Sequence, residues 1–232
     1  WSLSPASLED VLQGKVDFPY EAERPLKYFE EYMKKGCYPF FQEPEFETRM
    51  RQVINTTVDV DIPKYARMTI AATQKLKKFM YYISKSVPVK INFSDMARDL
   101  ELSRDELPKY LEYLEKAELV SVLRMKANGD AIHRKMDKLY LQNSNMSYVL
   151  SGENPDTGNA RKTIFYCWTK QKYDTVESPV SDFEIDGKTF EVGGRNKGKK
   201  RISNLEDAYV VKDTIEYVFD NQVPLWMFGF LY

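Results

Sequence analysis

Two acidic residues near the end of the chain have a spacing that suits metal binding. Asp182 and Glu191 flank the dipeptide Asp186-Gly187, which favours a type I′ turn because both central positions of that turn need a positive φ. Counting outward from the turn places Asp182 opposite Glu191 on adjacent strands, with both side chains on one face. Directly opposed carboxylates repel each other, so the pair is a candidate site for a hard cation such as Mg²⁺.

Solvated acids on the outer face of a hairpin would show the same spacing, because water screens their repulsion. Both interpretations therefore stay open. The other face of the hairpin is apolar, and we expect it to meet a core or a layer boundary. It carries Phe183, Ile185, Phe190 and Val192.

A glycine-rich basic segment follows the hairpin directly. It begins with Gly193-Gly194, which predict a mobile backbone. If the protein binds nucleic acid, we expect this loop to contact phosphates, and a solvated charged loop is the alternative. Its cations are Arg195, Lys197, Lys199, Lys200 and Arg201.

The composition describes a globular protein without a charge bias. The 232 residues are 43% hydrophobic and 30% charged with a net charge of −1, so no global basic field points to nucleic acid or a membrane. The longest apolar run, at 224–232, is too short to span a bilayer, and no secretory signal opens the chain. Cys37 and Cys167 form no metal-spaced set, which favours a reducing cytoplasm.

Hydrophobic periodicity divides the chain into three parts. Residues 1–70 predict a helical arm or linker without catalytic spacing. Residues 71–150 predict a helix, a short strand, two more helices and two strands, which is the order of a winged helix-turn-helix. Residues 151–232 predict a smaller unit of helix and strands. The expected fold class is therefore α+β.

Several element ends can be predicted from capping and turn residues. Asn92 is a candidate N-cap for a helix over 93–100, and Ser103 with Glu106 has the spacing of a capping box that begins the next helix. In the last part we expect a helix over 160–172. Strands are predicted at 87–91, 119–125, 136–142, 175–177, 208–211 and 225–231, with a turn at Asn128-Gly129.

The third helix of the middle part has nearly balanced charges. A helix that reads DNA should offer cations to phosphates and donors to bases, but here acids match the cations, so we favour protein packing over DNA binding. The cations are Arg104, Lys109 and Lys116, and the acids are Asp105, Glu106, Glu112 and Glu115. The predicted wing is more basic, with Arg124, Lys126, His133, Arg134, Lys135 and Lys138.

Five segments, taken in order, resemble the C-terminal region of a large prokaryotic group of predicted AAA-type ATPases. They read LKYFEEYMKKGCYP (26–39), FSDMARDLELSRDELPKYLEYLEKAEL (93–119), GNARKTIF (158–165), SDFEIDGKTFEVGGRNK (181–197) and PLWMFGFLY (224–232). The resemblance implies a helical arm and a winged helix followed by a restriction-endonuclease-like domain of unknown function. No GxxxxGK[ST] loop occurs here, and the chain begins at Trp1, so ATP is expected to bind a domain upstream.

The resemblance also implies a catalytic pattern that this chain matches only in part. Active nucleases of this fold place one acid on a helix, an Asp on one strand and Glu-x-Lys on the next, around a divalent metal. Asp182 and Glu191 match the strand acids. Gly193 stands where the lysine is implied, and Lys162 where the helix acid is implied. Lys162, or Lys197 or Lys199 from the loop, is a candidate replacement for the lysine.

Two functions follow from this pattern. The first is a non-catalytic regulatory or interaction region of an ATPase, partnered by its own ATPase domain and also able to contact DNA. The second is a metal-dependent nuclease with displaced catalytic groups. We expect the first, because two of the four implied groups are missing.

Overall fold

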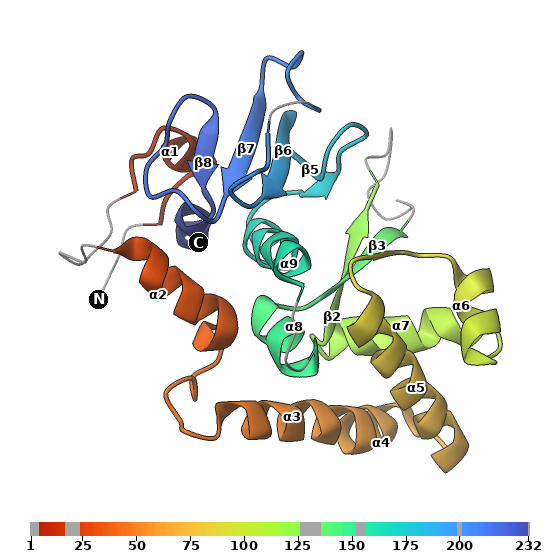
Figure 1. Cartoon of the computed structure of the whole chain (residues 1–232). Helices are drawn as coiled ribbons and strands as arrows, with labels where there is room; N and C mark the ends of the chain where they lie inside the picture. Colours follow the sequence, from red (N-terminus) through yellow and green to blue (C-terminus); the bar gives the residue numbers. More distant parts are fainter. Residues whose placement is uncertain (1–4, 17–23, 126–135, 152–155, 199–200, 232) are drawn as a thin grey trace.

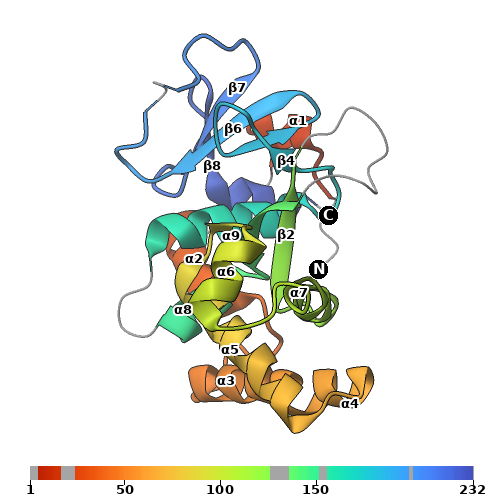
Figure 2. The ribbon, with the colours of Figure 1, turned by 90° about the vertical axis from the view of Figure 1, so that its right-hand side faces the viewer.

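The computed structural model describes residues 5–16, 24–125, 136–151, 156–198 and 201–231. These residues form a mixed α+β fold with a three-stranded antiparallel sheet and a five-stranded mixed sheet (Figure 1). In both views of the ribbon the larger sheet lies at one end of the molecule and α3 with α4 at the other, with α8 and α9 between them (Figure 2). None of the described helices is long and apolar enough to cross a bilayer.

The N-terminal part is helical, as predicted. Ser7 caps the first helix through a capping box with Asp10. The second helix continues into a π-helical turn, and so does the third. The elements are α1 (Leu8–Leu12), α2 (Pro25–Glu31), η1 (Tyr32–Gly36), α3 (Phe46–Thr56), η2 (Thr57–Asp61) and α4 (Ile62–Ala66).

The middle part has the predicted order of elements, and its strands pair in the order β1-β3-β2. Asn92 caps α6 by accepting from the backbone amides of Ser94 and Asp95, as expected. The elements are α5 (Ile70–Ser86), β1 (Val89–Lys90), α6 (Phe93–Leu100), α7 (Leu107–Lys116), β2 (Val120–Arg124), β3 (Met136–Leu141) and α8 (Ser144–Ser151). The turn predicted at Asn128-Gly129 lies outside the described residues.

The helix start predicted at Ser103 is wrong, because α7 begins at Leu107. The Ser103 hydroxyl accepts from the Asp105 amide at 3.4 Å, and not from the Glu106 amide as a capping box requires. The Glu106 carboxylate accepts from the Ser103 amide, but also from Lys75 Nζ, at 2.8 Å, and from the Tyr110 hydroxyl.

The C-terminal part contains α9 and the five-stranded sheet, whose strands lie in the order β4-β5-β6-β7-β8. β4, β5 and β6 pair antiparallel, and β6, β7 and β8 pair parallel. The elements are α9 (Thr157–Thr169), β4 (Val176–Glu177), β5 (Phe183–Ile185), β6 (Lys188–Gly193), β7 (Ala208–Lys212), β8 (Gln222–Pro224) and the 3-10 helix η4 (Leu225–Phe230).

The strand predicted at 225–231 is wrong, because this segment forms η4. Leu225, Trp226, Met227 and Phe228 are all buried in succession. A continuous apolar run does not distinguish a buried strand from a buried helical turn. The strand at this edge is the shorter β8, which ends at Pro224.

The predicted hairpin is confirmed. Asp186 and Gly187 have φ values of 50° and 80°, as a type I′ turn requires. Phe183 pairs with Phe190, and Ile185 pairs with Lys188. The register is therefore the one obtained by counting outward from the turn.

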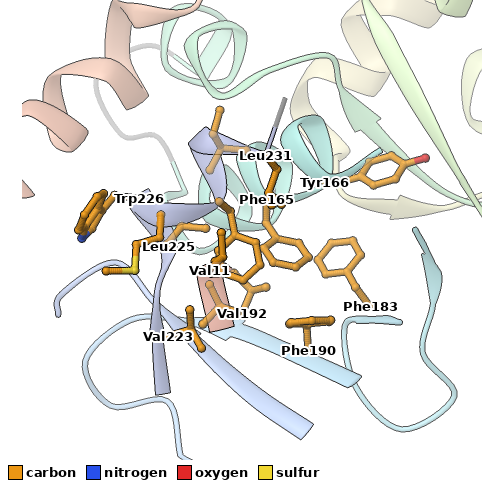
Figure 3. Close-up of a cluster of buried hydrophobic side chains, with 14 of the residues drawn as sticks. Val11, Phe165, Tyr166, Phe183, Phe190, Val192, Val223, Leu225, Trp226 and Leu231 are labelled. Carbon is orange, nitrogen blue, oxygen red and sulfur yellow. The ribbon is translucent and has the colours of Figure 1, made fainter. Parts of the chain in front are cut away.

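The N-terminal helices pack into two different hydrophobic cores. One core joins α1, α2 and η1 to α9, η4 and the five-stranded sheet. Figure 3 shows Val11 of α1 close to Phe165, Val192 and Leu225 in this cluster. The other core joins α3, η2 and α4 to the middle part. The arm therefore does not form a core of its own.

Candidate functional site

Asp182 and Glu191 lie side by side and buried at the base of the hairpin. The Asp182 amide donates to the Phe190 carbonyl at 3.3 Å, and Asp182 Oδ2 accepts from the Val192 amide at 2.9 Å. The exposed fractions of the two acids are 6% and 1%. The residues predicted to form a carboxylate pair are therefore brought together, but inside the protein.

A loop covers the sheet face that carries Glu191. Ile202, from the segment after β6, packs with Ala208 and Val210 of β7 in a small separate core. Val210 is also the register partner of Glu191 across the parallel pair of strands. Glu191 thus lies beneath the loop and away from solvent.

Asp182 has a lysine counter-ion from α9. Lys162 Nζ lies 2.6 Å from Asp182 Oδ1. Because Asp182 Oδ2 already accepts from the Val192 amide, both oxygens of this carboxylate have a partner. Lys162 comes from the helix position where an acid is implied for active nucleases, so an ammonium group replaces a carboxylate there.

Glu191 has a lysine counter-ion of its own, which comes from the loop. Lys197 Nζ lies 2.5 Å from Glu191 Oε1, and Arg201 Nη1 lies 3.9 Å from the same oxygen. The Ser181 hydroxyl donates to Glu191 Oε2. Burial raises the pKa of Glu191, but the hydrogen bonds from Lys197 and Ser181 outweigh it, so the pKa lies below its usual value. Glu191 is therefore an anion at neutral pH.

Gly193 provides the space that Lys197 occupies. A Cβ atom built on Gly193 would lie 2.5 Å from Lys197 Cγ and 2.6 Å from its Cβ, closer than atoms can approach. The aliphatic stem of Lys197 therefore lies where a side chain at position 193 would begin. A side chain from four residues later thus fills the space beside position 193.

The loop backbone makes hydrogen bonds on both sides of Asn196. Its amide donates to the Gly194 carbonyl at 2.9 Å, and Lys212 Nζ lies 3.5 Å from the Arg195 carbonyl. The Arg161 guanidinium packs against Gly194 and pairs with Asp213. Glycines at 193 and 194 thus permit side chains to pack closely against the loop.

The loop cations differ in how accessible they are. Lys197 is largely enclosed, Arg195 is exposed, and the Arg201 side chain is 66% exposed. Lys199 and Lys200 lie outside the described residues. Of the predicted nucleic-acid contacts, Arg195 and Arg201 are therefore the ones that the described surface presents.

The two acids do not fit a divalent metal in this arrangement. Among the described residues, no three His, Cys, Asp or Glu side chains gather into a group that could hold a metal ion. Mg²⁺ at Asp182 and Glu191 would have to displace the ammonium groups of Lys162 and Lys197. The two lysines supply the positive charge that a metal would otherwise bring.

The surface of α7 is charge-matched, as its sequence indicates. Lys116 pairs with Glu112 at 2.7 Å, and Arg124 of β2 pairs with Glu115 at 3.4 Å. Lys138 of β3 pairs with Glu177 of β4 at 2.5 Å, which ties the three-stranded sheet to the larger one. The other predicted wing cations, Lys126, His133, Arg134 and Lys135, lie outside the described residues.

Sequence reasoning missed Ser181 and the partners of the two lysines. Ser181 precedes Asp182 and has no motif of its own. Lys162 is 20 positions from Asp182, so no local pattern joins them. One feature of the sequence did point to Lys162, because the resemblance implies an acid at that position.

The fold and this site define an α+β protein with a buried pair of carboxylates, each neutralised by lysine. Residues 26–157 match the model of a family described as a domain of unknown function, DUF8612, and the chain belongs to that family. The matched part runs from α2 to the first residue of α9 and excludes the paired acids. No curated protein and no solved structure matches the chain.

Proposed function

We propose that this chain is the C-terminal interaction region of a cytoplasmic AAA-type ATPase, in which a restriction-endonuclease-like unit binds nucleic acid without cutting it. The middle part has the element order of a winged helix-turn-helix. In the last part, α9 precedes the antiparallel strands β4, β5 and β6, and β7 then pairs parallel to β6. The two acids match the strand acids of the implied nuclease pattern in sequence, and their close approach at the base of the hairpin supports the proposal.

The lysine counter-ions are the observation that supports a non-hydrolytic role. Hydrolysis of a phosphodiester needs an oriented water and a fixed positive charge at the developing oxyanion. Here Lys162 takes the place of an acid, and Lys197 is engaged with Glu191. The centre is neutral without a metal, and its carboxylate oxygens are occupied by protein donors.

The nucleic-acid surface in this proposal is the edge where the parallel strands end. Arg195 follows β6, Lys212 ends β7, and Arg201 lies in the loop between these strands. In open sheets, ligands commonly bind beyond the carboxyl ends of parallel strands. Contacts from cations to phosphates predict binding that is independent of sequence and weakens steeply with salt.

A cleavage assay combined with metal titration tests the proposal. The 232-residue protein should bind a labelled DNA duplex but leave it intact in 5 mM Mg²⁺ or Mn²⁺. By calorimetry it should bind no Mn²⁺ at millimolar concentration, whereas Lys162→Glu, which restores the implied helix acid beside Asp182, should gain Mn²⁺ binding. Lys172→Glu, three residues after α9 ends, makes the same charge change away from Asp182 and should gain none.

The packing of Lys197 over Gly193 favours one second candidate, a nuclease with a displaced lysine. In that case Lys197 acts from the position of residue 193. Metal-dependent cleavage that Glu191→Gln and Lys197→Ala both abolish, while the fold persists, would establish this function in place of the non-hydrolytic one.

The link to an ATPase rests on the resemblance and needs its own test. The reading frame upstream of Trp1 should encode a phosphate-binding loop of the GxxxxGK[ST] type. In the full-length protein, removing residues 1–232 should change ATP hydrolysis or its response to DNA. An upstream frame without such a loop would separate this chain from ATPases.

A further inference from the structure

Glu191 pairs with two of the described loop cations, the mostly enclosed Lys197 and the exposed Arg201. Lys197 Nζ lies 2.5 Å from Glu191 Oε1, and Arg201 Nη1 lies 3.9 Å from the same atom. Only 1% of Glu191 is exposed, so no nucleic acid can reach this carboxylate in the described arrangement. The cations that could contact phosphates are thus partly directed toward an internal anion.

A phosphate and a carboxylate compete for the same ammonium group. A lysine paired with Glu191 cannot contact a phosphate at full strength, and its departure would leave a buried charge without a partner. We infer that Glu191 is an internal competitor that withholds Lys197, and to a lesser extent Arg201, from the nucleic-acid backbone. This inference rests on the proposed function and concerns the regulation of the same surface.

The geometry at Gly193 gives this restraint a second, uncharged component. Because a Cβ at position 193 would collide with Lys197 Cβ and Cγ, the lysine reaches Glu191 only while residue 193 is glycine. Gly193 is not among the glycines with positive φ, so alanine suits its backbone. Two independent substitutions can therefore release Lys197. One removes the charge of Glu191, and the other fills the space beside Gly193.

Removing the charge should strengthen DNA binding. Glu191→Gln keeps the size of the side chain and an acceptor for Ser181, but no longer holds Lys197 as an ion pair. With a fluorescein-labelled 20-base-pair duplex, we expect tighter binding at 100 mM NaCl. The slope of log K against log salt should steepen by about 0.9 for each released cation.

Filling the space beside Gly193 should also strengthen DNA binding, without changing any charge. Gly193→Ala should displace Lys197 toward solvent and steepen the salt slope by about 0.9. Gly198→Ala is the matched control, since a Cβ there would meet nothing within 4 Å. Its affinity and salt slope should equal those of the wild type.

A combined variant identifies the released residue. Lys197→Ala alone should change DNA affinity little, because this lysine is already engaged. In the Glu191→Gln background the same substitution should reverse most of the gain. Such dependence on background would not arise if Glu191 acted only through general net charge.

The outcomes separate this inference from the proposed function. If the wild type binds DNA and both Glu191→Gln and Gly193→Ala bind with unchanged or lower affinity, the inference is overturned while the proposed function stands. If no variant binds DNA, the nucleic-acid part of the proposed function fails. Hydrogen exchange over residues 191–198 then tests the restraint itself. Faster exchange in both variants supports it, and unchanged exchange overturns it.

Discussion

Lys197 occupies the space that a side chain on Gly193 would need, because Cγ and Cβ of the lysine lie 2.5 and 2.6 Å from where a Cβ on the glycine would be. The two residues are therefore dependent on each other. Any side chain at 193 excludes Lys197 from Glu191, and the glycine in turn is covered by the lysine. An apparent gap in the nuclease pattern is thus a packing position.

Gly193→Ala should lower the free energy of unfolding by about 1–3 kcal/mol, the usual cost of forcing an extra group into a packed site. Urea denaturation followed by circular dichroism measures this. Gly198→Ala, at an open position of the same loop, should change stability by less than about 0.5 kcal/mol. Equal stability of the two variants would contradict the described packing.

Lys162→Met should destabilise the protein by about 2–3 kcal/mol, because it leaves Asp182 buried without its counter-ion. The pair is mostly enclosed, with the Lys162 side chain 27% exposed and that of Asp182 8% exposed. Lys162→Met combined with Asp182→Asn should recover most of this loss. A double variant as unstable as the single one would show that the lysine stabilises the fold by packing instead.

The stability that Glu191 provides should depend on pH. Because its pKa in the folded protein lies below the usual value of 4.5, the contribution is present above pH 4.5 and is lost as pH falls through the folded pKa. The wild type should therefore be more stable than Glu191→Gln at pH 7, and the difference should shrink toward pH 3. Thermal denaturation across this range measures it, and a constant difference would contradict the ion pair.

Asn145→Ala should loosen the arm from the rest of the molecule. The fully buried Asn145 amide donates to the carbonyls of Tyr32 and Met33, each at 2.9 Å, and its oxygen accepts from the Cys37 amide at 2.8 Å. Losing these bonds should cost about 2–4 kcal/mol and increase hydrogen exchange in η1. Asn204→Ala, at an exposed position, is the control and should change neither.

The two cysteines should react slowly with alkylating agents. Cys37 and Cys167 line the same cavity of about 420 Å³, although 130 positions separate them. Burial raises the pKa of Cys37 to about 12 and also raises that of Cys167. At pH 8 both thiols stay protonated, so iodoacetamide should label them much faster in 6 M urea than in the native protein. Equal rates by intact mass would show that the cavity opens freely.

Local signals predicted the elements that depend on neighbouring residues. The Asp186-Gly187 turn fixes the hairpin because its φ values and register are set within a few residues. Asn92 caps α6 for the same reason. The carboxylate pair could therefore be placed from the sequence.

Signals that depend on distant residues were missed or misread. Glu106 pairs with Lys75, 31 positions away, and the helix expected from Ser103 begins only at Leu107. The contacts of Lys197 with Glu191 and Gly193 follow no periodicity in the sequence. The apolar run at 225–231 becomes helical because α9 and the sheet enclose it, and composition alone does not reveal that enclosure.

The Ala6 amide donates to the Phe230 carbonyl at 3.0 Å, so segments far apart in the sequence meet. The core around α9 also takes in α1 and α2. During synthesis α1 and α2 are made well before α9 and η4, so they can pack against these elements only after η4 has been made. The middle part can fold before this packing takes place. This order predicts a slow, late folding phase governed by the contact between these distant segments.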